Sequence, residues 1–522
     1  PRYRYPVIKN KIYFLYKHGR SFFSTDRILQ EQSNFVARQR EEMNWAFSQQ
    51  LISADDMVRF EQDLERAQDV GTRRGQEGPR ACDMIDETKL RTWSSAFSRF
   101  LPHADSDGLT LVLVSKAFPP RSTGGIATFS RDLAEAFAAR GNTVHVIAEG
   151  SEFSRVDFEN GVWVHRIVPN SHKLASELQK LSFPQSLWDW SASALSEARR
   201  IASHRAIDIV EAPIWDCEGI AFLMDSRWPL VTSLHTTLHF FLDSHPELRK
   251  DPQWMRAHGQ PVLATEKRLM QQSSAIRANS EAIRNEIEKA YGFEFDAERT
   301  IVIRHGMRDI PPPTSSFNSQ APTVLFVGRL EARKGIDTLL QAIPIVLAQE
   351  PSVKFRIIGD KSQHSPAGRT YQEDFLASPG GSKWAANVDF EGQVDDSALM
   401  KAYQTCDIFV APSRFESFGL VLVEAMRSGK PVIGCLAGGM TEIVEHGKCG
   451  FLVPPGDAEH LAAGMLELVK SPALRESFGR AGRQRFEEEF SSARMAAESV
   501  PLYRRARSSH ETGVDHEDLV HQ

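Results

Sequence analysis

Residues 407–434 read DIFVAPSRFESFGLVLVEAMRSGKPVIG. Residues 407–412 are a short apolar run that ends in proline, which predicts a buried strand. Residues 413–417 are mostly polar and predict a loop. Residues 418–428 have the apolar spacing of a helix, and the glycine and proline that follow are typical of a helix end. A buried strand, a loop and a helix in this order indicate an α/β protein.

The same stretch holds two carboxylates, Glu416 and Glu424, eight positions apart. At about 100° per residue, eight helical positions make slightly over two turns, so both lie on roughly one side of the element. The backbone amides of Ser417, Phe418 and Gly419 are first-turn donors without intrahelical partners. Carboxylates accept from hydroxyl groups and such amides bind oxyanions, so the pattern favours a hydroxylated, negatively charged ligand. The alternative is a surface helix with two solvated glutamates.

In the rest of the chain, predicted strands alternate with predicted helices in two halves, which a proline-rich break at residues 311–316 separates. Strands alternating with helices imply parallel, right-handed units. Two doubly wound halves predict a cleft, with ligands at the carboxyl ends of the strands. Strands are expected at residues 109–115, 143–148, 229–234, 323–327, 354–358, 388–390, 407–411 and 431–434, and helices at 125–140 and 335–347.

Gly124 and Gly125 follow the first predicted strand and open the first predicted helix. Glycines let the backbone approach a ligand closely, and a helix N-terminus favours an anion. The alternative is a simple tight turn. The spacing is not the G-x-G-x-x-G pattern of dinucleotide-binding loops, which argues against a dehydrogenase.

The segment FVGRLEARKG at residues 326–335 places two cations after a strand. Gly328 ends the strand, and Arg329 and Lys334 lie in the following loop. Arginine offers a planar fork and lysine a point charge, a pairing that suits a diphosphate. The alternative is two solvated cations, and Arg333 is expected to be solvated.

These motifs, in this order, resemble the signature of retaining glycosyltransferases with the GT-B fold, the family 4 or group 1 glycosyltransferases. The resemblance rests on the E-x7-E pair in ESFGLVLVEAM and on the GRL-x4-KG segment. The resemblance covers most of residues 108–505; residues 1–106 have no counterpart in the minimal family. It implies two Rossmann-like lobes facing a cleft. It also implies transfer of a hexose-type sugar from a UDP- or GDP-linked nucleotide diphosphate sugar to an acceptor hydroxyl, with retention of configuration.

The resemblance also implies roles for individual residues. Arg329 and Lys334 would neutralise the donor phosphates, Glu416 would hold the sugar and Glu424 the ribose. The segment 438–442 matches the family's Gly-Gly-x-x-Glu, with a loop and a cap as the alternative. The remaining donor contacts would come from Gly124, Gly125, Gly328, Val394, Ser417, Phe418, Gly419 and Leu420.

His235 closes the predicted strand at residues 229–234 and matches the family's cleft histidine, which contacts the transferred sugar. The alternative is a satisfied polar residue at a strand end, and His239 is its rival for the role. Glu211 and Asp216 are expected to face the same cleft, either as acceptor ligands or as solvated loop acids.

Residues 1–20 contain six Lys or Arg and no acid. A helix capped near Ser24 and a second one starting at Ser53 predict a helical hairpin, followed by a linker at 71–80. The extension is a candidate for contact with an anionic membrane surface or a protein through residues 1–70. The alternative is an ordinary domain face.

The composition excludes several classes of protein. The net charge of −6 gives no basic field for nucleic acid. Five scattered cysteines without C-x-x-C spacing argue against zinc and disulfides and suit a reducing compartment. No apolar run long enough to span a membrane and no signal peptide is visible. No D-x-D pair follows a strand, so no required metal or other cofactor is expected. The expected location is cytoplasmic, with the inner face of a membrane as an alternative.

Two further functions remain open besides a metal-independent glycosyltransferase. One is a non-catalytic GT-B-fold binding or scaffold protein, and the other is a nucleotide-sugar epimerase. The expected domains are a helical extension and linker at 1–106, an acceptor lobe at 107–310, a donor lobe at 311–482, a returning helix at 483–507 and a polar tail at 508–522.

Overall fold

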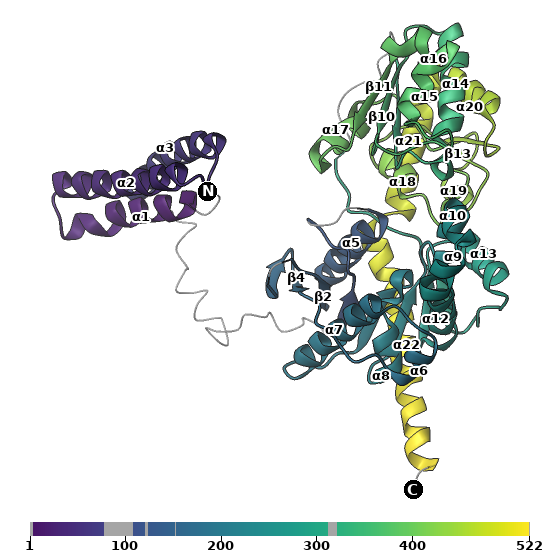
Figure 1. The fold of residues 1–522 in the computed structure, drawn as a ribbon, viewed down its shortest axis with the longest axis horizontal. Coiled ribbons are helices and arrows are strands. Elements are labelled where there is room, and N and C mark those ends of the chain that lie inside the picture. The colour runs from purple at the N-terminus through teal and green to yellow at the C-terminus, as the bar shows by residue number, and fades with distance from the viewer. Residues whose placement is uncertain (1–3, 78–107, 121–123, 152, 312–320, 521–522) are drawn as a thin grey trace. The chain divides into compact units, whose positions relative to one another are not determined.

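The computed structural model describes residues 4–77, 108–120, 124–151, 153–311 and 321–520, the last nine by their backbone alone. The chain divides into two compact units, Pro1–Pro102 and His103–Gln522 (Figure 1). Residues 121–123, just before the two predicted loop glycines, and residues 312–316 of the predicted proline-rich break lie outside the described residues.

Within residues 4–77 of the first unit, the structure has a further helix before the two of the predicted hairpin: the three are α1 (Arg4–His18), α2 (Thr25–Ser48) and α3 (Ala54–Glu77). Ser24 caps α2 as predicted, because its Oγ accepts from the backbone N–H of Arg27 at 3.3 Å. The buried side chains of the three helices form one core: Ile8, Ile12, Tyr16, Ile28, Val36, Met43, Phe60, Leu64 and Ala67.

Two glycines explain why the predicted linker is helical as far as Glu77. A Cβ on Gly71 would lie 2.7 Å from the carbonyl oxygen of Lys9, and one on Gly75 would lie 2.5 Å from the Cβ of Tyr16. Gly71 and Gly75 therefore allow close contact between α3 and α1. Their role is helix packing rather than a break in the chain.

The second unit begins with an eight-stranded sheet in the order β3-β4-β2-β1-β5-β6-β7-β8. All neighbouring strands are parallel except β3 and β4. The strands are β1 (Thr110–Val114), β2 (Thr143–Glu149), β3 (Arg155–Glu159), β4 (Val162–Ile167), β5 (Ile209–Pro213), β6 (Leu230–Ser233), β7 (Ala275–Ala278) and β8 (Thr300–Val302).

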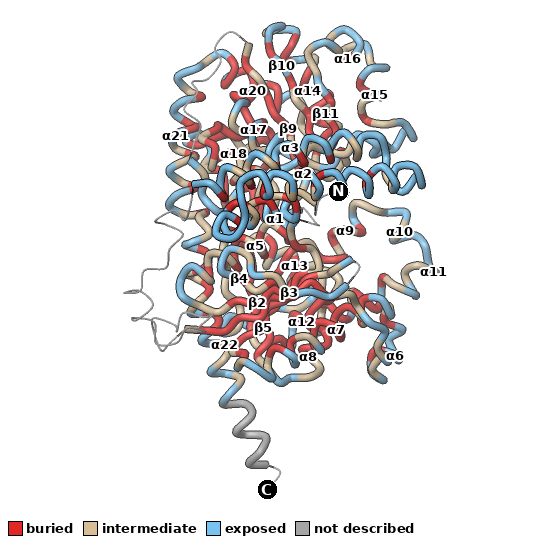
Figure 2. Tube along the Cα trace, turned by 90° about the vertical axis from the view of Figure 1, so that its left-hand side faces the viewer, coloured by how far each residue is buried: buried red, intermediate tan, exposed pale blue. Residues whose placement is uncertain are grey.

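Helices cover both faces of this sheet, so its central strands are buried throughout (Figure 2). In β1, Leu111 and Leu113 join the core under α5, while Val112 and Val114 join the core under α7 and α12. The helices of this lobe are α5 (Gly125–Ala139), α6 (Ser176–Lys180), α7 (Gln185–Ala202), α8 (Ile220–Asp225), α9 (Leu238–Ser244), α10 (Pro246–Lys250), α11 (Pro252–Trp254), α12 (Gln260–Gln272) and α13 (Glu281–Tyr291).

The second lobe is a six-stranded parallel sheet in the order β11-β10-β9-β12-β13-β14. Its strands are β9 (Thr323–Val327), β10 (Lys354–Ile358), β11 (Val388–Gly392), β12 (Ile408–Val410), β13 (Val432–Cys435) and β14 (Gly450–Val453). Its helices are α14 (Ile336–Gln349), α15 (Tyr371–Ala377), α16 (Pro379–Trp384), α17 (Asp396–Thr405), α18 (Leu420–Arg427), α19 (Met440–Ile443), α20 (Ala458–Lys470) and α21 (Pro472–Glu489). The two doubly wound lobes confirm the predicted fold class.

The last helix, α22 (Ser492–Val520), returns to the first lobe, where it packs on α5 and on β5, β6 and β7. The contact centres on a buried guanidinium. Arg277 donates to Glu211 Oε1 at 2.9 Å and to the hydroxyl oxygen of Tyr503 at 2.9 Å. Glu211 is fully buried in this network, so the expectation that it faces the cleft is wrong. The helix runs to Val520, so the predicted polar tail from Ser508 is helical over its described residues.

Candidate functional site

The second sheet reverses its strand order between β9 and β12. The chain moves outward from β9 to β10 and β11, then returns to the other side of β9 as β12. Ligands of open α/β sheets bind at the carboxyl end of such a switch point. The loop after β9 carries Arg329 and Lys334, and the loop after β12 carries Ser413 and Glu416. The sheet order therefore brings together two motifs that are far apart in sequence.

Lys334 and Glu416 form an ion pair at this switch point. The Nζ of Lys334 donates to Glu416 Oε1 at 2.6 Å, and the Oγ of Ser413 donates to the same oxygen at 2.8 Å. Burial acts to raise the pKa of the Glu416 carboxyl, but the charges of Lys334 and Arg333 outweigh it and hold the pKa below its ordinary value. Glu416 is therefore an ionised, oriented carboxylate at neutral pH.

The two arginines of the loop after β9 differ in environment. Arg329 has a side chain that is 54% exposed and pairs with Glu331 at 3.1 Å. The expectation that Arg333 is solvated is wrong, since its side chain is only 13% exposed. Arg333 also pairs with Glu331, donates to the carbonyl oxygen of Phe415, and lies 3.9 Å from Glu416 Oε2. Arg329 is thus the more accessible of the two to a ligand.

Glu424 lies in α18, which begins at Leu420 rather than at the predicted residue 418. The hydroxyl of Tyr403 donates to Glu424 Oε2 at 2.5 Å. Burial raises the pKa of Glu424, whereas the pKa of Glu416 is lowered. Two carboxyls whose pKa values are pushed apart by their surroundings are suited to different roles.

The segment 438–442 packs against the backbone of the loop that carries Glu416. The N–H of Gly439 donates to the carbonyl oxygen of Glu416 at 2.9 Å. A Cβ on Gly438 would lie 2.1 Å from that same oxygen, so only glycine fits there. Glu442 accepts from the N–H of Ala282, at the start of α13 in the first lobe, at 2.9 Å. The segment therefore fixes the loop and joins it to the other lobe.

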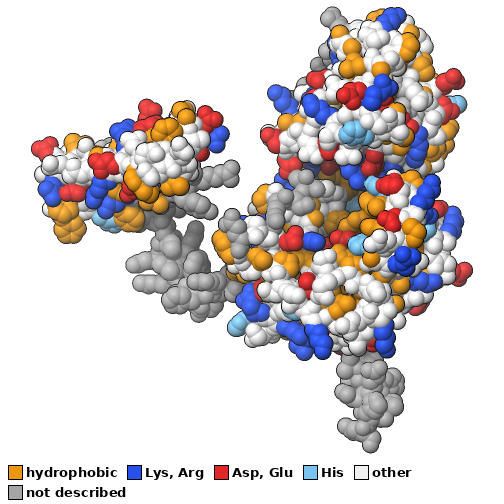
Figure 3. Space-filling view, in the orientation of Figure 1, with side chains coloured by type: hydrophobic (Ala, Val, Ile, Leu, Met, Phe, Trp, Pro, Cys, Tyr) orange, Lys and Arg blue, Asp and Glu red, His pale blue; other side chains and the backbone are white. Residues whose placement is uncertain are grey.

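The glycine loop of the first lobe faces the start of α18. Gly124 has a φ of 138° and immediately precedes α5. A Cβ on Gly125 would lie 3.7 Å from the Cδ1 of Leu420. The amino ends of α5 and α18 therefore approach one another, and the surface of the unit is hollowed between the two lobes (Figure 3).

His235 follows β6 and is 5% exposed. Its ring packs against Phe129 and His305, with centroids 5.1 Å and 5.3 Å away, and the ring of His305 in turn lies 5.0 Å from that of Phe418 in the loop after β12. Burial lowers the pKa of His235 to about 3, so the ring is neutral. Among the described residues, the Nε2 of His235 has no hydrogen-bond partner. The rival His239 lies on α9, half-buried and 3.9 Å from Asp243.

The structure places the other predicted donor contacts at the same sheet edge. Gly328 follows β9, and Val394 follows β11 and packs on the second-lobe core. Sequence reasoning missed three residues that hold the site together: Ser413, Tyr403, and Ser280, whose Oγ donates to the carbonyl oxygen of Ser417 at 2.6 Å. Ser413 belongs to the quoted motif, but no local pattern relates Tyr403 or Ser280 to it.

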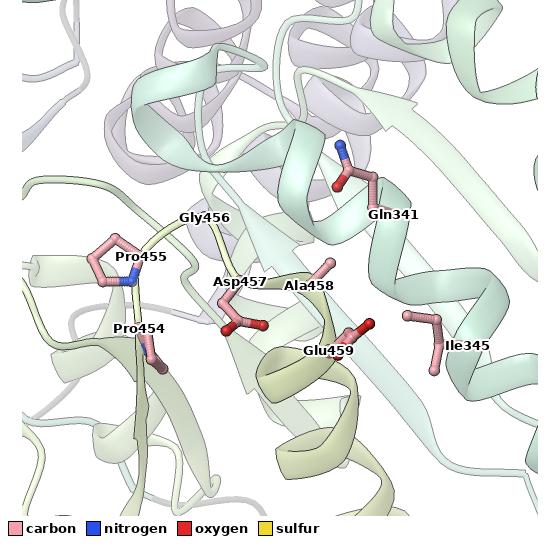
Figure 4. A pocket seen from close by; sticks show the side chains of 8 residues that line it. All are labelled: Gln341, Ile345, Pro454, Pro455, Gly456, Asp457, Ala458 and Glu459. Carbon is pink, nitrogen blue, oxygen red and sulfur yellow. The ribbon is translucent and has the colours of Figure 1, made fainter.

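A second recess, of about 600 Å³, lies on the second lobe away from these residues. Gln341 and Ile345 of α14 face the turn at 454–457 that precedes α20 (Figure 4). None of the predicted site residues lines it. Within the described ranges, no cluster of three His, Cys, Asp or Glu side chains has the geometry to hold a metal ion, and no helix combines the length and apolarity needed to cross a membrane.

Two Rossmann-like lobes, with a cation–carboxylate pair at the switch point of the second sheet, are the arrangement expected of the GT-B fold. Family comparisons agree. Residues 123–308 match the model of Glycosyltransferase Family 4, and residues 308–485 match the model of Glycosyl transferases group 1. The chain belongs to this glycosyltransferase family, and its enzyme class is glycosyltransferase.

Individual relatives have low sequence identity, but the matches cover nearly their whole length. An uncharacterised glycosyltransferase of Methanocaldococcus jannaschii is 26% identical over 414 residues, which cover 76% of this chain and 98% of the relative. A D-inositol 3-phosphate glycosyltransferase of Jonesia denitrificans is 28% identical over 412 residues, covering 74% and 92%. The sucrose-phosphate synthase of Thermosynechococcus elongatus shares the fold with a TM-score of 0.62 at 22% identity, covering 77% of this chain and all of that one.

Proposed function

We propose that the protein transfers a hexose-type sugar from a UDP- or GDP-linked sugar to an acceptor hydroxyl, with retention of configuration and without a required metal. The observation that carries the proposal is the pairing of Lys334 with Glu416 at the donor-side switch point. A buried carboxylate and a cation side by side suit a ligand with hydroxyl groups next to a diphosphate. The exposed guanidinium of Arg329 lies in the same loop.

In the proposed reaction, the bond between the anomeric carbon and the phosphate oxygen breaks. The acceptor oxygen forms a new bond to the same face of the sugar, and its proton passes to the departing phosphate oxygen. The products are a glycoside and a nucleoside diphosphate. Negative charge grows on the phosphate as it leaves, so Arg329, Lys334 and the amides of residues 417–420 would stabilise the transition state electrostatically.

The remaining residues would orient the donor. Glu416 would accept hydrogen bonds from sugar hydroxyls, and the neutral His235 has an unbonded Nε2 suited to the same task. Glu424 would bind the ribose through Oε1, since Tyr403 already occupies Oε2. The backbone near Val394 would contact the nucleobase. Gly124, Gly125 and Gly328 would line the diphosphate.

The names of relatives leave the acceptor open. Relatives of similar identity are named D-inositol 3-phosphate glycosyltransferase and glycogen synthase, whose names imply different acceptors. The names of relatives therefore do not identify the acceptor of this protein.

A thermal-shift panel of UDP, GDP and ADP tests donor binding directly, because a ligand that binds only the folded state stabilises it by mass action. We expect one nucleotide to raise the melting temperature, and Arg329→Ala and Lys334→Ala to remove the shift. No response to any of the three would refute the proposal. Nucleotide binding without transfer would favour the scaffold alternative, and interconversion of nucleotide sugars would favour the epimerase.

The location of the enzyme is a separate part of the proposal. We propose a cytoplasmic protein whose extension, residues 1–70, contacts a membrane surface or a protein near the acceptor. The exposed aromatic side chains Phe14, Phe22, Phe23 and Trp45 support such a contact. Co-sedimentation with vesicles that contain or lack anionic lipid tests the membrane version. Equal sedimentation with both would remove it.

A further inference from the structure

The loop after β12 contains three backbone N–H groups without a partner. Among the described residues, no atom accepts a hydrogen bond from the N–H of Ser417, Phe418 or Gly419. Phe418 and Gly419 are buried. Buried backbone donors are normally paired, so donors left free here are available to a ligand. A free donor stabilises an oxyanion only if it points at it, so the groups that fix its direction matter for the site.

Two hydrogen bonds fix the directions of the first two of these N–H groups. The carbonyl oxygen of Glu416 accepts from the N–H of Gly439 at 2.9 Å, and the carbonyl oxygen of Ser417 accepts from the Oγ of Ser280 at 2.6 Å. A peptide unit is planar and trans, so the C=O of one residue and the N–H of the next point in opposite directions. The first bond therefore orients the N–H of Ser417, and the second orients the N–H of Phe418. The first comes from the second lobe itself, whereas the second comes from the other lobe.

Ser280 also has a local role, as the N-cap of α13. Its Oγ accepts from the N–H of Ile283 at 3.0 Å, and the residue is fully buried. Capping uses only a lone pair of the hydroxyl oxygen, so the hydroxyl proton remains free to be donated to the carbonyl oxygen of Ser417. An aspartate would cap the helix about equally well but could not donate. A hydroxyl at this position therefore serves both the helix and the loop of the second lobe.

The same end of α13 makes a second contact with the second lobe. The N–H of Ala282 donates to Glu442 Oε1 at 2.9 Å. This N–H belongs to the first turn of the helix and has no partner within it, and a carboxylate is favoured at a helix N-terminus. Glu442 belongs to the segment 438–442, which also supplies the bond from Gly439. The amino end of α13 is thus bonded both to the loop and to the segment that supports the loop.

The side chain of Phe418 contacts the first lobe as well. Its ring lies edge-on to the ring of His305, with centroids 5.0 Å apart and an interplanar angle of 69°. His305 follows β8 and is 3% exposed. The backbone and the side chain of this part of the loop are therefore both held by residues of the first lobe.

We propose that Ser280 is a positioning residue for the donor diphosphate. By holding the carbonyl group of Ser417, it directs the N–H of Phe418 at the terminal phosphate, the one from which the sugar departs. The bond between Ala282 and Glu442 keeps the helix end in place. Ser280 itself does not touch the donor. The inference rests on the proposed glycosyl transfer and extends it: the phosphate site of the second lobe is complete only while the first lobe is in contact with it.

The alternative is that Ser280 only caps α13. Loss of a cap lowers the stability of the helix, and it gives no reason for one part of a nucleotide to lose affinity more than another. Loss of the bond to Ser417 misdirects a single phosphate donor, so it should weaken the binding of ligands that carry the terminal phosphate. The two roles therefore differ in which ligands they affect.

Calorimetry on the full chain makes this distinction, with UDP, GDP and ADP as the diphosphates and UMP, GMP and AMP, measured by competition, as the monophosphates. The monophosphates lack the terminal phosphate. We expect Ser280→Ala to weaken binding of the preferred diphosphate by about tenfold, since a hydrogen bond to a charged group is lost or distorted. Binding of the corresponding monophosphate should stay within about twofold of wild type.

Ser471→Ala is the matched control. Ser471 caps α21 within the second lobe, where its Oγ accepts from the N–H of Leu474 at 3.2 Å. The substitution removes the same kind of cap, so it should lower the melting temperature by a similar amount to Ser280→Ala. Its affinity for both classes of nucleotide should equal that of wild type.

A second pair of variants tests the same contact if Ser280→Ala does not fold. Glu442→Gln keeps a side-chain oxygen that can accept from the N–H of Ala282, whereas Glu442→Ala leaves that N–H without its acceptor. We expect Glu442→Ala to weaken diphosphate binding by about threefold or more, with the monophosphate unaffected, and Glu442→Gln to bind both within about twofold of wild type.

The possible results separate this inference from the proposed function. If Ser280→Ala weakens diphosphate and monophosphate binding equally, or leaves diphosphate binding unchanged, Ser280 is only a cap and the inference is wrong. Equal losses of diphosphate affinity in Ser280→Ala and Ser471→Ala would overturn it in the same way. If none of the three diphosphates binds the wild-type protein, the proposed function itself fails, and this inference fails with it.

Discussion

Replacing Lys334 by Met should both destabilise the protein and abolish transfer, and the two effects can be measured separately. The substitution keeps an unbranched apolar stem but removes the charge that lies 2.6 Å from Glu416. The Glu416 side chain is 10% exposed, so its carboxylate would remain buried. The negative charge of Glu416 would then be compensated only by Arg333, 3.9 Å from Oε2, and by the hydroxyl of Ser413.

The expected cost follows from that geometry. Removing one partner of a fully buried ion pair costs about 3–5 kcal/mol. Because Lys334 is 19% exposed and two compensating groups remain, we expect a smaller loss of about 2–3 kcal/mol in the free energy of unfolding. Adding Glu416→Gln should recover about 1 kcal/mol or more, since no charge is then left uncompensated.

Urea unfolding measures the loss of stability, and hydrogen exchange in peptides that cover residues 408–427 shows whether the loss is local to the site. Arg329→Met is the matched control: its side chain is 54% exposed, so its stability should change by no more than about 0.5 kcal/mol. Both variants should lose transfer, because both groups are proposed to contact the diphosphate. Equal stability of the two variants would refute the structural argument, and wild-type transfer by Lys334→Met would refute the phosphate role.

Four further predictions concern other parts of the molecule. Glu424→Gln should weaken nucleoside diphosphate binding by about tenfold in calorimetry, through loss of one charged hydrogen bond, whereas Glu416→Gln should mainly lower kcat. Burial lowers the pKa of His145 to about 3, below its unfolded value of about 6.5. The stability that the neutral ring contributes is therefore present above pH ~6.5 and is lost as the pH falls. In urea titrations, His145→Gln should reduce the dependence of the unfolding free energy on pH between pH 6.5 and 5 by up to about 1.4 kcal/mol per pH unit. Gly75→Ala should destabilise the first unit by roughly 1–2 kcal/mol, since overpacking against Tyr16 outweighs the gain in helix propensity, and faster hydrogen exchange in residues 4–77 would reveal it. Transfer should be unchanged by EDTA, and a loss restored by Mg²⁺ would refute metal independence.

Local patterns predicted the second lobe well. The strands expected at 323–327 and 354–358 coincide with β9 and β10. The first is an almost continuous apolar run, the second has apolar residues at Phe355, Ile357 and Ile358, and both are bounded by turn residues. The sequence also assigned Lys334 and Glu416 to loops at the site. Their contact across 82 positions could not be predicted from spacing, since it depends on the order of strands in the sheet.

The errors have a common physical origin, which is contact between distant segments. Gly71 and Gly75 look like linker residues until α1 is seen to pack against them. Glu211 looks like a strand-end acid, but its partners Arg277 and Tyr503 follow 66 and 292 positions later.

The network around Arg277 has a consequence for how the protein is made. Its guanidinium and Glu211 are buried in the first lobe, but Tyr503 is synthesised 226 positions after Arg277. At ~5–20 residues per second, the ribosome needs roughly 11–45 s to cover that distance. During this time the whole second lobe is translated while the first lobe lacks the helix that closes its core. The first lobe cannot complete its native packing in the order of translation, so a nascent chain stalled before residue 492 should remain open to proteases at the surface that α22 later covers.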